Sequence, residues 1–388
     1  MLVACSSSGD GTANAESGDI AEGPGGEPQS NVDTSPTHAS TIPTTLHNGS
    51  TDARMDEALA ALSAHAEALA EADRFSGAML VAHNGEILVE DAWGLADREA
   101  GTPNTPDTKF RVGSINKMFT AVAILQLVES GRLALDDPIG KYLTDYPNQE
   151  LASTVTVRHL LTHSGGTGDV VDDDHWDTYL QHRLELREHS DYIALFGDRA
   201  VSFEPGSRYE YSNYGFILLG ALIEAVTGES YYDYVREHVF TPAGMTATDS
   251  LPESDDVPGR AVGYTKSEDS WVSAADLLPW RGNAAGLGYS TVGDLNHFAD
   301  ALTSGVLLSD GMLAEATQGQ PPGYEYGFGF TIFPWATKPY GHAGEFPGVN
   351  GVLLIYPEYG FVVVVLSNLD PPAAEDLAVY LHRSAPNL

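Results

Sequence analysis

Ser114-Ile115-Asn116-Lys117 opens an apolar run, residues 118–128 (MFTAVAILQLV), that ends shortly before Gly131. This pattern predicts a buried helix. Residues three apart on a helix share a face, so we expect the Lys117 amine to lie against the Ser114 hydroxyl. A serine becomes a strong nucleophile when a base activates it, and a lysine is a base when burial or nearby cations lower its pKa. The alternative interpretation is that Ser114 caps the helix and Lys117 lies on the surface.

A second motif, Tyr211-Ser212-Asn213, follows a Pro205-Gly206 turn and precedes the apolar run 215–223. A tyrosine phenol can shuttle protons when a nearby cation lowers its pKa. An asparagine amide can hold both a lysine and a substrate amide in place. The alternative is that Ser212 or Asn213 only caps the helix that follows.

A third motif, His342-Ala343-Gly344, lies in a region of alternating strands. Glycine at such a position would let another backbone, such as that of a substrate, approach closely. Histidine would offer a proton or a positive edge near neutral pH. A lone histidine at the end of a strand can also be purely structural.

The order and spacing of the three motifs resemble the serine β-lactamase and penicillin-binding superfamily. The resemblance is closest to the class C branch, which includes DD-carboxypeptidases, D-aminopeptidases and esterases. Segment 156–166 (TVRHLLTHSGG) is similar to the most recognisable loop of that branch, and the likeness covers residues 52–383.

The resemblance implies a reaction through a covalent acyl-enzyme. Ser114 would attack a carbonyl, Lys117 and Tyr211 would share the proton transfers, and Asn213 would orient them. Which of the lysine and the tyrosine is the base stays open, because the two should titrate as a coupled pair. We expect no cofactor and no metal ion.

The third motif departs from the β-lactamase pattern, in which Lys-Thr-Gly binds the substrate carboxylate. Here His342 is a weaker cation, Ala343 has no hydroxyl, and Glu345 brings a negative charge, unless its side chain points away. The resemblance places the oxyanion hole at the backbone N–H groups of Ser114 and Glu345, beside Gly344. A free carboxylate should bind poorly at such a site.

We therefore predict a serine hydrolase that acts on an ester or an amine-bearing amide, of the esterase or D-amino-acid peptidase type. A β-lactamase or DD-carboxypeptidase is the alternative within the same class. A surface receptor that is acylated without turnover, like the penicillin sensors of this superfamily, is the alternative from another class. The expected partner is a small molecule or peptide.

The fold class predicted is α/β (α+β): an antiparallel sheet built from both chain ends and flanked by terminal helices, with a central, mainly helical subdomain. We expect a hydrolase domain over 51–388, with a sheet subdomain at 51–113 and 285–388 and a helical subdomain at 114–284. The expected strands are 75–81, 87–93, 326–332, 338–343, 349–356 and 361–366; the expected helices include 52–72, 176–196, 214–227 and 372–382, with no strands between 135 and about 280.

Several further polar residues invite a functional interpretation. His159 and His163 are predicted to be structural, because neither forms the helical pair with an acid that metalloproteases require. The acids that surround His175 are predicted to form a solvated loop near the mouth of the cleft. They are Asp169, Asp172, Asp173, Asp174 and Asp177.

The chain is strongly acidic, with 55 Asp and Glu against 19 Lys and Arg and a formal charge of −36 over 388 residues. Such a surface repels nucleic acid and anionic membranes, so neither is an expected partner. Few lysines with many acids favour adaptation to high salt, where repulsion is screened within about 3 Å at molar ionic strength. An acidic protein from low salt is the alternative.

The first 50 residues differ from the rest. Cys5, the only cysteine, follows Leu2-Val3-Ala4 in a pattern that resembles a lipoprotein cleavage box, although no basic start or apolar signal precedes it. The following residues, up to about position 50, are small and polar and predict a disordered acidic linker. We expect an exported protein, on the extracellular face of the membrane through a lipid on Cys5, or secreted. No apolar stretch is long enough to predict a transmembrane helix.

Overall fold

The computed structural model describes residues 48–268 and 270–384. Cys5 and the predicted linker before residue 48 lie outside this part. The helices are α1 Asn48–Glu71, α2 Asn116–Glu129, α3 Gln149–Thr154, α4 Val157–Leu161, α5 Trp176–His182, α6 His189–Phe196, α7 Asn213–Thr227, α8 Tyr231–Val235, α9 Thr241–Ala243, α10 Val292–Thr303, α11 Asp310–Ala316 and α12 Ala373–Ser384.

Twelve strands and four short helical turns complete the described part of the chain. The strands are β1 Gly77–His83, β2 Glu86–Trp93, β3 Leu95–Asp97, β4 Thr102–Pro103, β5 Phe110–Arg111, β6 Tyr264–Ser267, β7 Ser270–Ser273, β8 Tyr289–Ser290, β9 Thr331–Ile332, β10 Tyr340–Phe346, β11 Val349–Tyr356 and β12 Phe361–Ser367. The turns are η1 Gly113–Ile115, η2 Ile139–Lys141, η3 Arg236–Phe240 and η4 Ala275–Leu277.

The predicted fold class is confirmed: both chain ends form one six-stranded antiparallel sheet, in the order β2-β1-β12-β11-β10-β9. β1 pairs with β12 from Gly77 opposite Ser367 to His83 opposite Phe361. β1 and β2 are joined at Asn84-Gly85, where φ is +51° and +81°. A tight hairpin turn of type I′ requires positive φ at both positions, which explains this residue pair.

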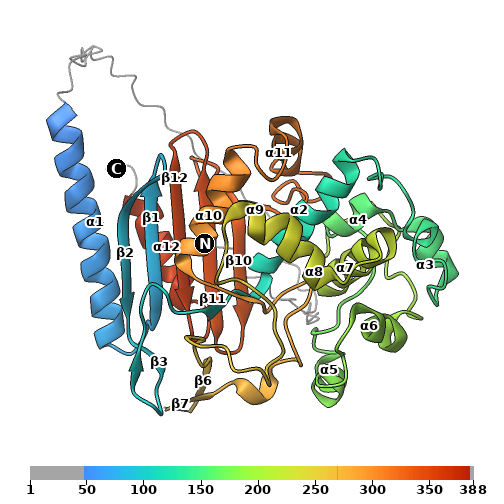
Figure 1. Ribbon diagram of the computed structural model, residues 1–388, viewed down its shortest axis with the longest axis horizontal. Coiled ribbons are helices and arrows are strands. Elements are labelled where there is room, and N and C mark those ends of the chain that lie inside the picture. Colours follow the sequence, from blue (N-terminus) through green and yellow to red (C-terminus); the bar gives the residue numbers. More distant parts are fainter. Residues whose placement is uncertain (1–47, 269, 385–388) are drawn as a thin grey trace, which may run out of the picture.

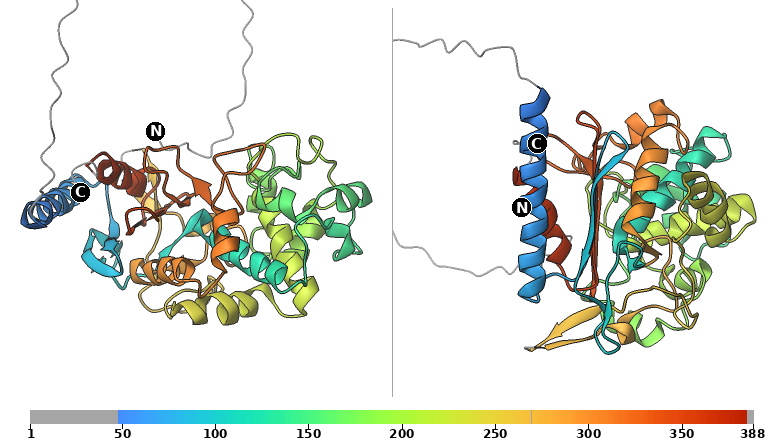
Figure 2. Two further views of the ribbon diagram at one scale, coloured as in Figure 1. Left: turned by 90° about the horizontal axis from the view of Figure 1, so that it is seen from above. Right: turned by 60° about the vertical axis from the view of Figure 1, so that its left-hand side comes forward.

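In the sheet, β1 and β12 from opposite ends of the described chain lie side by side (Figure 1). The sheet separates two hydrophobic cores. On one face, α1 and α12 pack on the sheet through residues such as Leu62, Leu377 and Val365. On the other face, the sheet packs on α2 and α10 and continues into the helical region. Figure 2 shows α1 and α12 together on one side of the sheet and the remaining helices on the other. Because β11 and β12 are covered on both faces, almost all of their residues are apolar.

Helix α2 is the central element of the helical region. Eleven of its fourteen residues are buried, since α7, α8 and η3 pack around it and β10 crosses its start. None of the described helices has an apolar stretch that could cross a membrane.

The predicted strand 326–332 is mostly wrong, because only Thr331 and Ile332 pair with β10. Gly329 has a φ of +79°, which takes the chain out of the extended conformation. A Cβ at this position would lie 2.3 Å from the Cβ of Ala121 on α2. The segment bends there because it packs directly on α2.

Two other expectations about the central region need correction. The predicted helix 176–196 is two helices, α5 and α6, and Glu188 forms a capping box with Asp191 at the start of the second. A hairpin of β6 and β7 lies in the stretch where no strands were expected. Most residues of this hairpin are exposed, so its sequence has only a weak alternation of apolar and polar residues, the pattern that predicts a strand.

A pair of carboxyl groups joins α12 to the strand that approaches the site. The side chains of Glu345 on β10 and Glu375 on α12 share a hydrogen bond. Burial, followed by the hydrogen bond and the charge of Glu345, raises the pKa of Glu375 to about 8. The side chain of Asn350 accepts hydrogen bonds from the backbone N–H groups of Ala374 and Glu375 at 2.6 and 3.3 Å, so it anchors the start of α12.

The Glu345–Glu375 pair should make the stability of the protein depend on pH. Between the ordinary carboxyl pKa near 4.5 and the raised value of about 8, the folded state holds a proton that the unfolded state has lost. The free energy of unfolding should therefore fall as pH rises through this range, by at most about 1.4 kcal/mol per pH unit from this group. Glu375→Gln should flatten that fall in urea unfolding curves recorded at each pH. Glu358→Gln, at an exposed turn, is the control and should not.

Candidate active site

The backbone of η1 crosses the backbone of β10 at a pair of glycines. A Cβ on Gly344 would lie 2.0 Å from the Val112 carbonyl oxygen and 3.1 Å from the Ser114 nitrogen. A Cβ on Gly113 would lie 2.7 Å from the Glu345 nitrogen. Only glycine permits so close an approach, and it brings the backbone N–H groups of Ser114 and Glu345 to the same place.

Ser114 and Lys117 lie against one another at the start of α2. The Lys117 ammonium donates to the Ser114 hydroxyl at 3.0 Å, to the Asn213 side-chain oxygen at 2.7 Å and to the Ala285 carbonyl at 2.6 Å. The lysine is fully buried, so the interpretation that it lies on the surface is wrong. Neither η1 nor α2 has a side-chain cap, so Ser114 is not a helix cap either.

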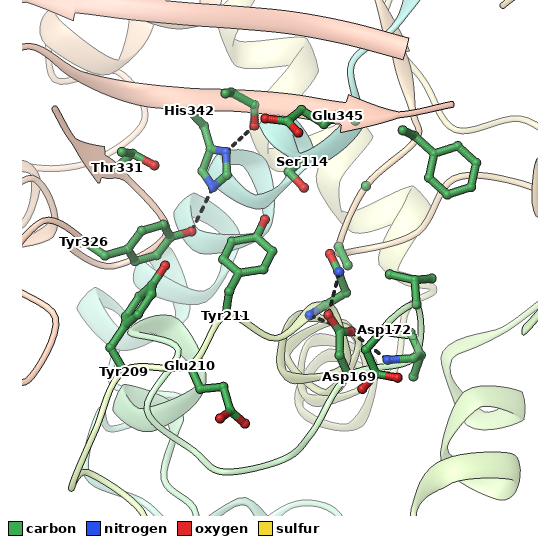
Figure 3. A pocket seen from close by; sticks show the side chains of 18 of the residues that line it. Ser114, Asp169, Asp172, Tyr209, Glu210, Tyr211, Tyr326, Thr331, His342 and Glu345 are labelled. Atoms are coloured by element: carbon green, nitrogen blue, oxygen red, sulfur yellow. Dashed lines mark hydrogen bonds between the residues drawn. The ribbon is translucent and has the colours of Figure 1, made fainter. Parts of the chain in front are cut away.

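The second motif both caps a helix and binds the lysine, and neighbouring residues perform these two expected roles. The Ser212 hydroxyl caps α7 by accepting from the Gly215 N–H at 2.9 Å. Asn213, the first residue of α7, turns its side-chain oxygen to Lys117. The Tyr211 ring lies 4.8 Å from the Lys117 nitrogen. Figure 3 shows the hydroxyls of Tyr211 and Ser114 directed into one space.

His163 contacts two residues of the second motif, Tyr211 and Ser212. It is buried, and its Nδ1 accepts from the Ser212 N–H at 3.1 Å. Its ring packs on that of Tyr211, with the centroids 4.1 Å apart. Burial, followed by the charge of Lys117, holds the pKa of His163 well below its usual value. The neutral ring therefore fixes the backbone at Ser212.

His342 is buried on β10, beside the nucleophile. Its Nδ1 lies against the Ala343 carbonyl, which only accepts, so Nδ1 carries the hydrogen. Its Nε2 therefore accepts from the Tyr326 hydroxyl at 3.0 Å. Burial, followed by the charge of Lys117, lowers the pKa of His342 to about 3. The expectation of a weak cation is wrong: His342 is a neutral acceptor that orients Tyr326.

Glu345 and Gly344 face opposite sides of β10. Strand alternation places His342 and Gly344 toward α2, whereas Ala343 packs in the core beneath α1 and α12. Glu345 shares that second face, where its side chain bonds to Glu375. Of the two possibilities for Glu345, the structure has the one in which the carboxylate points away from Ser114.

Asp169 belongs to the site, and the prediction that it lies in a solvated acidic loop is wrong. It does not belong to a solvated acidic loop, because its carboxylate accepts from the Asn213 backbone N–H at 3.1 Å and from the Asn213 side-chain NH2 at 2.9 Å. It also accepts from the Val170 N–H at 2.7 Å. No helical or strand spacing links Asp169 to Asn213, so no local pattern could have revealed the contact.

These residues lie at the bottom of a cavity of about 1070 Å³ between the sheet and the helical region. The wall is rich in aromatic rings and contains acids, and the described residues that line it include no arginine or lysine. The aromatic residues are Tyr179, Tyr192, Tyr209, Tyr211, Tyr324, Tyr326, Phe333, Trp335 and Phe346, and the acids are Asp169, Asp172, Glu210, Glu325 and Glu345.

Potential metal ligands gather at one place within the described ranges, away from the cavity lining. Glu229, Glu237 and His238 have ligand atoms within 4.8 Å of one another, and both glutamates are exposed. Exposed acids often cluster without a bound ion, so this group does not indicate a metal centre.

A serine hydroxyl hydrogen-bonded to a buried lysine, at a crossing of two backbones that offers two N–H groups, defines a serine acyl hydrolase. The chain belongs to the β-lactamase family, whose model "Beta-lactamase" matches residues 55–385. It is therefore a β-lactamase-related serine hydrolase.

Three relatives illustrate the range of this family. PbpX of Bacillus subtilis is 33% identical over 302 residues, which cover 75% of this chain and 70% of the relative. A penicillin-binding protein from Bacillus halodurans has a TM-score of 0.74 at 32% identity, covering 81% of this chain and 98% of that one. The D-amino acid amidase of Ochrobactrum anthropi SV3 has a TM-score of 0.70 at 25% identity, covering 88% and 97%.

The backbone crossing predicts a strong effect of one methyl group. Gly344→Ala should separate β10 from η1, because the added carbon would lie 2.0 Å from a backbone oxygen. We expect a loss of about 1–3 kcal/mol of stability, typical of overpacking, and labelling of Ser114 by a fluorophosphonate at least about 100-fold slower. Gly311→Ala on α11, where a Cβ meets nothing within 4 Å, is the control. Equal labelling rates in both variants would contradict the geometry.

The neutral state of His342 predicts its behaviour in solution. Its ring signals in a nitrogen-labelled sample should remain those of the Nδ1–H form from pH 8 down to about 5, since its pKa is about 3. His342→Asn would identify the signals. Below about pH 6.5 the unfolded chain binds a proton here that the fold excludes, so this residue lowers stability as pH falls. A midpoint near pH 6.5 would contradict burial as described.

Proposed function

We propose that this protein hydrolyses esters or amides that lack a free carboxylate near the scissile bond, through an acyl-enzyme on Ser114. The observation that carries the proposal is the fully buried Lys117 amine, 3.0 Å from the Ser114 hydroxyl. Removal from water disfavours the charged form of a lysine, so burial favours its action as a base.

Acylation begins when the Ser114 hydroxyl loses its proton and attacks the substrate carbonyl. The Lys117 nitrogen lies 3.0 Å from the Ser114 hydroxyl and 4.8 Å from the centre of the Tyr211 ring. Either residue can receive the proton as part of a coupled pair. The protonated pair then supplies a proton to the leaving alcohol or amine. Asn213 holds the lysine in place during both transfers.

The oxyanion hole in this proposal consists of the backbone N–H groups of Ser114 and Glu345. The close contact of Gly113 with β10, where a Cβ would lie 2.7 Å from the Glu345 nitrogen, supports this assignment. Two preorganised donors stabilise the negative oxygen of the tetrahedral intermediate, and loss of one donor from such a hole typically costs about 10²–10³ in rate. A water molecule then attacks the acyl group, with the same lysine–tyrosine pair as base.

The charges of the cavity support the expected substrate class. His342 is neutral and Ala343 has no hydroxyl. Among the described residues that line the wall are four acids other than Glu345, and no arginine or lysine. A substrate carboxylate would be repelled, whereas an uncharged ester or an amide with a free amine would not. One relative in the family is a D-amino acid amidase, which supports small amides or peptides as partners.

A surface receptor that is acylated without turnover is the second candidate. Two similar structures are described as penicillin-binding proteins or their homologues, and binding of a β-lactam needs acylation alone. The test is the lifetime of a fluorescent penicillin on the protein. Label that clears supports an enzyme, and label that persists for hours supports the receptor.

The substrate prediction is tested with p-nitrophenyl esters, D-amino acid amides, D-Ala-D-Ala peptides and nitrocefin. Esters and amine-bearing amides should be turned over at least about tenfold faster, by kcat/KM, than the carboxylate-bearing substrates. Ser114→Ala should abolish turnover of every substrate. Efficient hydrolysis of nitrocefin would contradict the proposed specificity, and unchanged turnover by Ser114→Ala would contradict the mechanism.

The expectations on environment remain part of the proposal. An acidic surface of this kind is consistent with high salt, where screening removes its self-repulsion. Melting temperatures in dilute buffer and in molar potassium chloride test this, and full stability in dilute buffer would contradict it.

Lipidation at Cys5, with display outside the membrane, is tested by metabolic labelling with a fatty acid, with Cys5→Ser as control.

A further inference from the structure

The carboxylate of Asp169, a half-buried residue, lies across the Asn213 amide from Lys117. Its two oxygens accept three hydrogen bonds: one from Val170 N–H, one from Asn213 N–H and one from the Asn213 side-chain NH2. A side-chain amide has an NH2 end and an oxygen end. Because Asp169 binds the NH2 end, the oxygen end must face Lys117, and it does so at 2.7 Å.

This orientation determines what a neutral lysine can do. A neutral amine has two hydrogens and one lone pair. The Ala285 carbonyl and the Asn213 oxygen can only accept, and at 2.6 and 2.7 Å they take both hydrogens. The lone pair can then be directed at the Ser114 oxygen, which lies 3.0 Å away. An Asn213 amide turned the other way would direct an N–H at the lysine and compete for that lone pair.

We propose that Asp169 is a positioning residue that fixes the orientation of the Asn213 amide and thereby directs the lone pair of neutral Lys117 at the Ser114 hydroxyl. The inference rests on the proposed function, in which Lys117 takes part in proton transfer. Asp169 does not touch the reacting atoms, and it acts only through Asn213.

All three hydrogen bonds of Asp169 come from N–H donors, so its carboxyl group acts as an acceptor. Burial raises the pKa of this carboxyl, and the N–H donors and the charge of Lys117 only limit that rise. Asp172, in the same loop, is the nearby like charge. The two histidines of the site, His163 and His342, are neutral, and Asp169 is connected to the lysine through the Asn213 amide.

Asp169→Asn tests the inference with almost no change in shape. The new amide keeps an oxygen for the Val170 and Asn213 backbone N–H groups, and its NH2 then faces the NH2 of Asn213. The Asn213 amide should turn over and present an N–H to Lys117. We expect kcat to fall by about 100-fold or more with KM changed by less than about threefold, because a correctly placed base contributes about 10²–10⁴.

The pH profile separates this role from simple loss of structure. Asp169→Asn removes a negative charge and directs an N–H at the lysine, and both changes favour the neutral amine. The acid limb of kcat/KM should therefore move to lower pH, even though the plateau is lower. A merely structural defect would lower the plateau and leave the limb where it was.

Exchanging the carboxylate and the amide between positions 169 and 213 should restore an acceptor for Lys117. In Asp169→Asn/Asn213→Asp, the amide at 169 donates to the carboxylate at 213, whose other oxygen accepts from Lys117. We expect recovery of at least about tenfold in kcat over the single variant, with an acid limb above that of wild type because the carboxylate favours the ammonium form. Asp173→Asn, at an exposed position of the same loop, is the control, and melting temperatures verify folding.

The results distinguish this inference from the proposed function. If wild type shows no turnover or labelling that depends on Ser114, the proposed function fails. If Ser114 is required but Asp169→Asn keeps the wild-type kcat and acid limb, only the present inference fails. It also fails if the exchanged variant is folded and no faster than the single variant. If the Asp169→Asn variant is too unstable to assay, the exchanged variant is compared with wild type instead, by its kcat and by the position of the acid limb of its pH profile.

Discussion

The burial of one lysine is the constraint on which the rest of the structure depends. Lys117 is wholly removed from water, and a buried ammonium without acceptors would cost several kcal/mol. Its acceptors come from distant parts of the chain, the Asn213 side chain at the start of α7 and the Ala285 carbonyl after the helical region. The helical region and the return of the chain to the sheet must both be correctly folded before the lysine is satisfied. The site and the fold therefore stabilise one another.

A second constraint is the contact between backbones at Gly113 and Gly344. One glycine belongs to the turn before α2 and the other to β10, and neither position has room for a Cβ. Behind β10, the Glu345–Glu375 pair joins α12 to this strand, and Asn350 anchors the start of α12 to the neighbouring strand β11. The position of the two N–H groups beside Ser114 thus depends on layers on both faces of the sheet, not on the loop that carries the nucleophile alone.

Much of this could be predicted from local patterns, because periodicity and turn chemistry are local properties. The helix after Ser114, the turn at Asn84-Gly85 and strands β11 and β12 all have clear signatures, and the family resemblance supplied the order of the layers. The contact of Asp169 with Asn213 joins residues 44 apart, and the neutral state of His342 depends on burial, so neither leaves a local pattern. The bend at Gly329 was missed for the same reason, since α2 imposes it.

The pairing of β1 with β12 has a consequence for how the protein is made. The first strand of the sheet stays without this partner until Ser367 has left the ribosome. Contacts between residues so far apart in sequence form slowly, and an unpaired strand is prone to aggregation. A nascent chain of this protein therefore cannot complete its central sheet before β12 has been synthesised, and hydrolytic chemistry is withheld until then. The chain should depend most on chaperones between the emergence of β1 and that of β12.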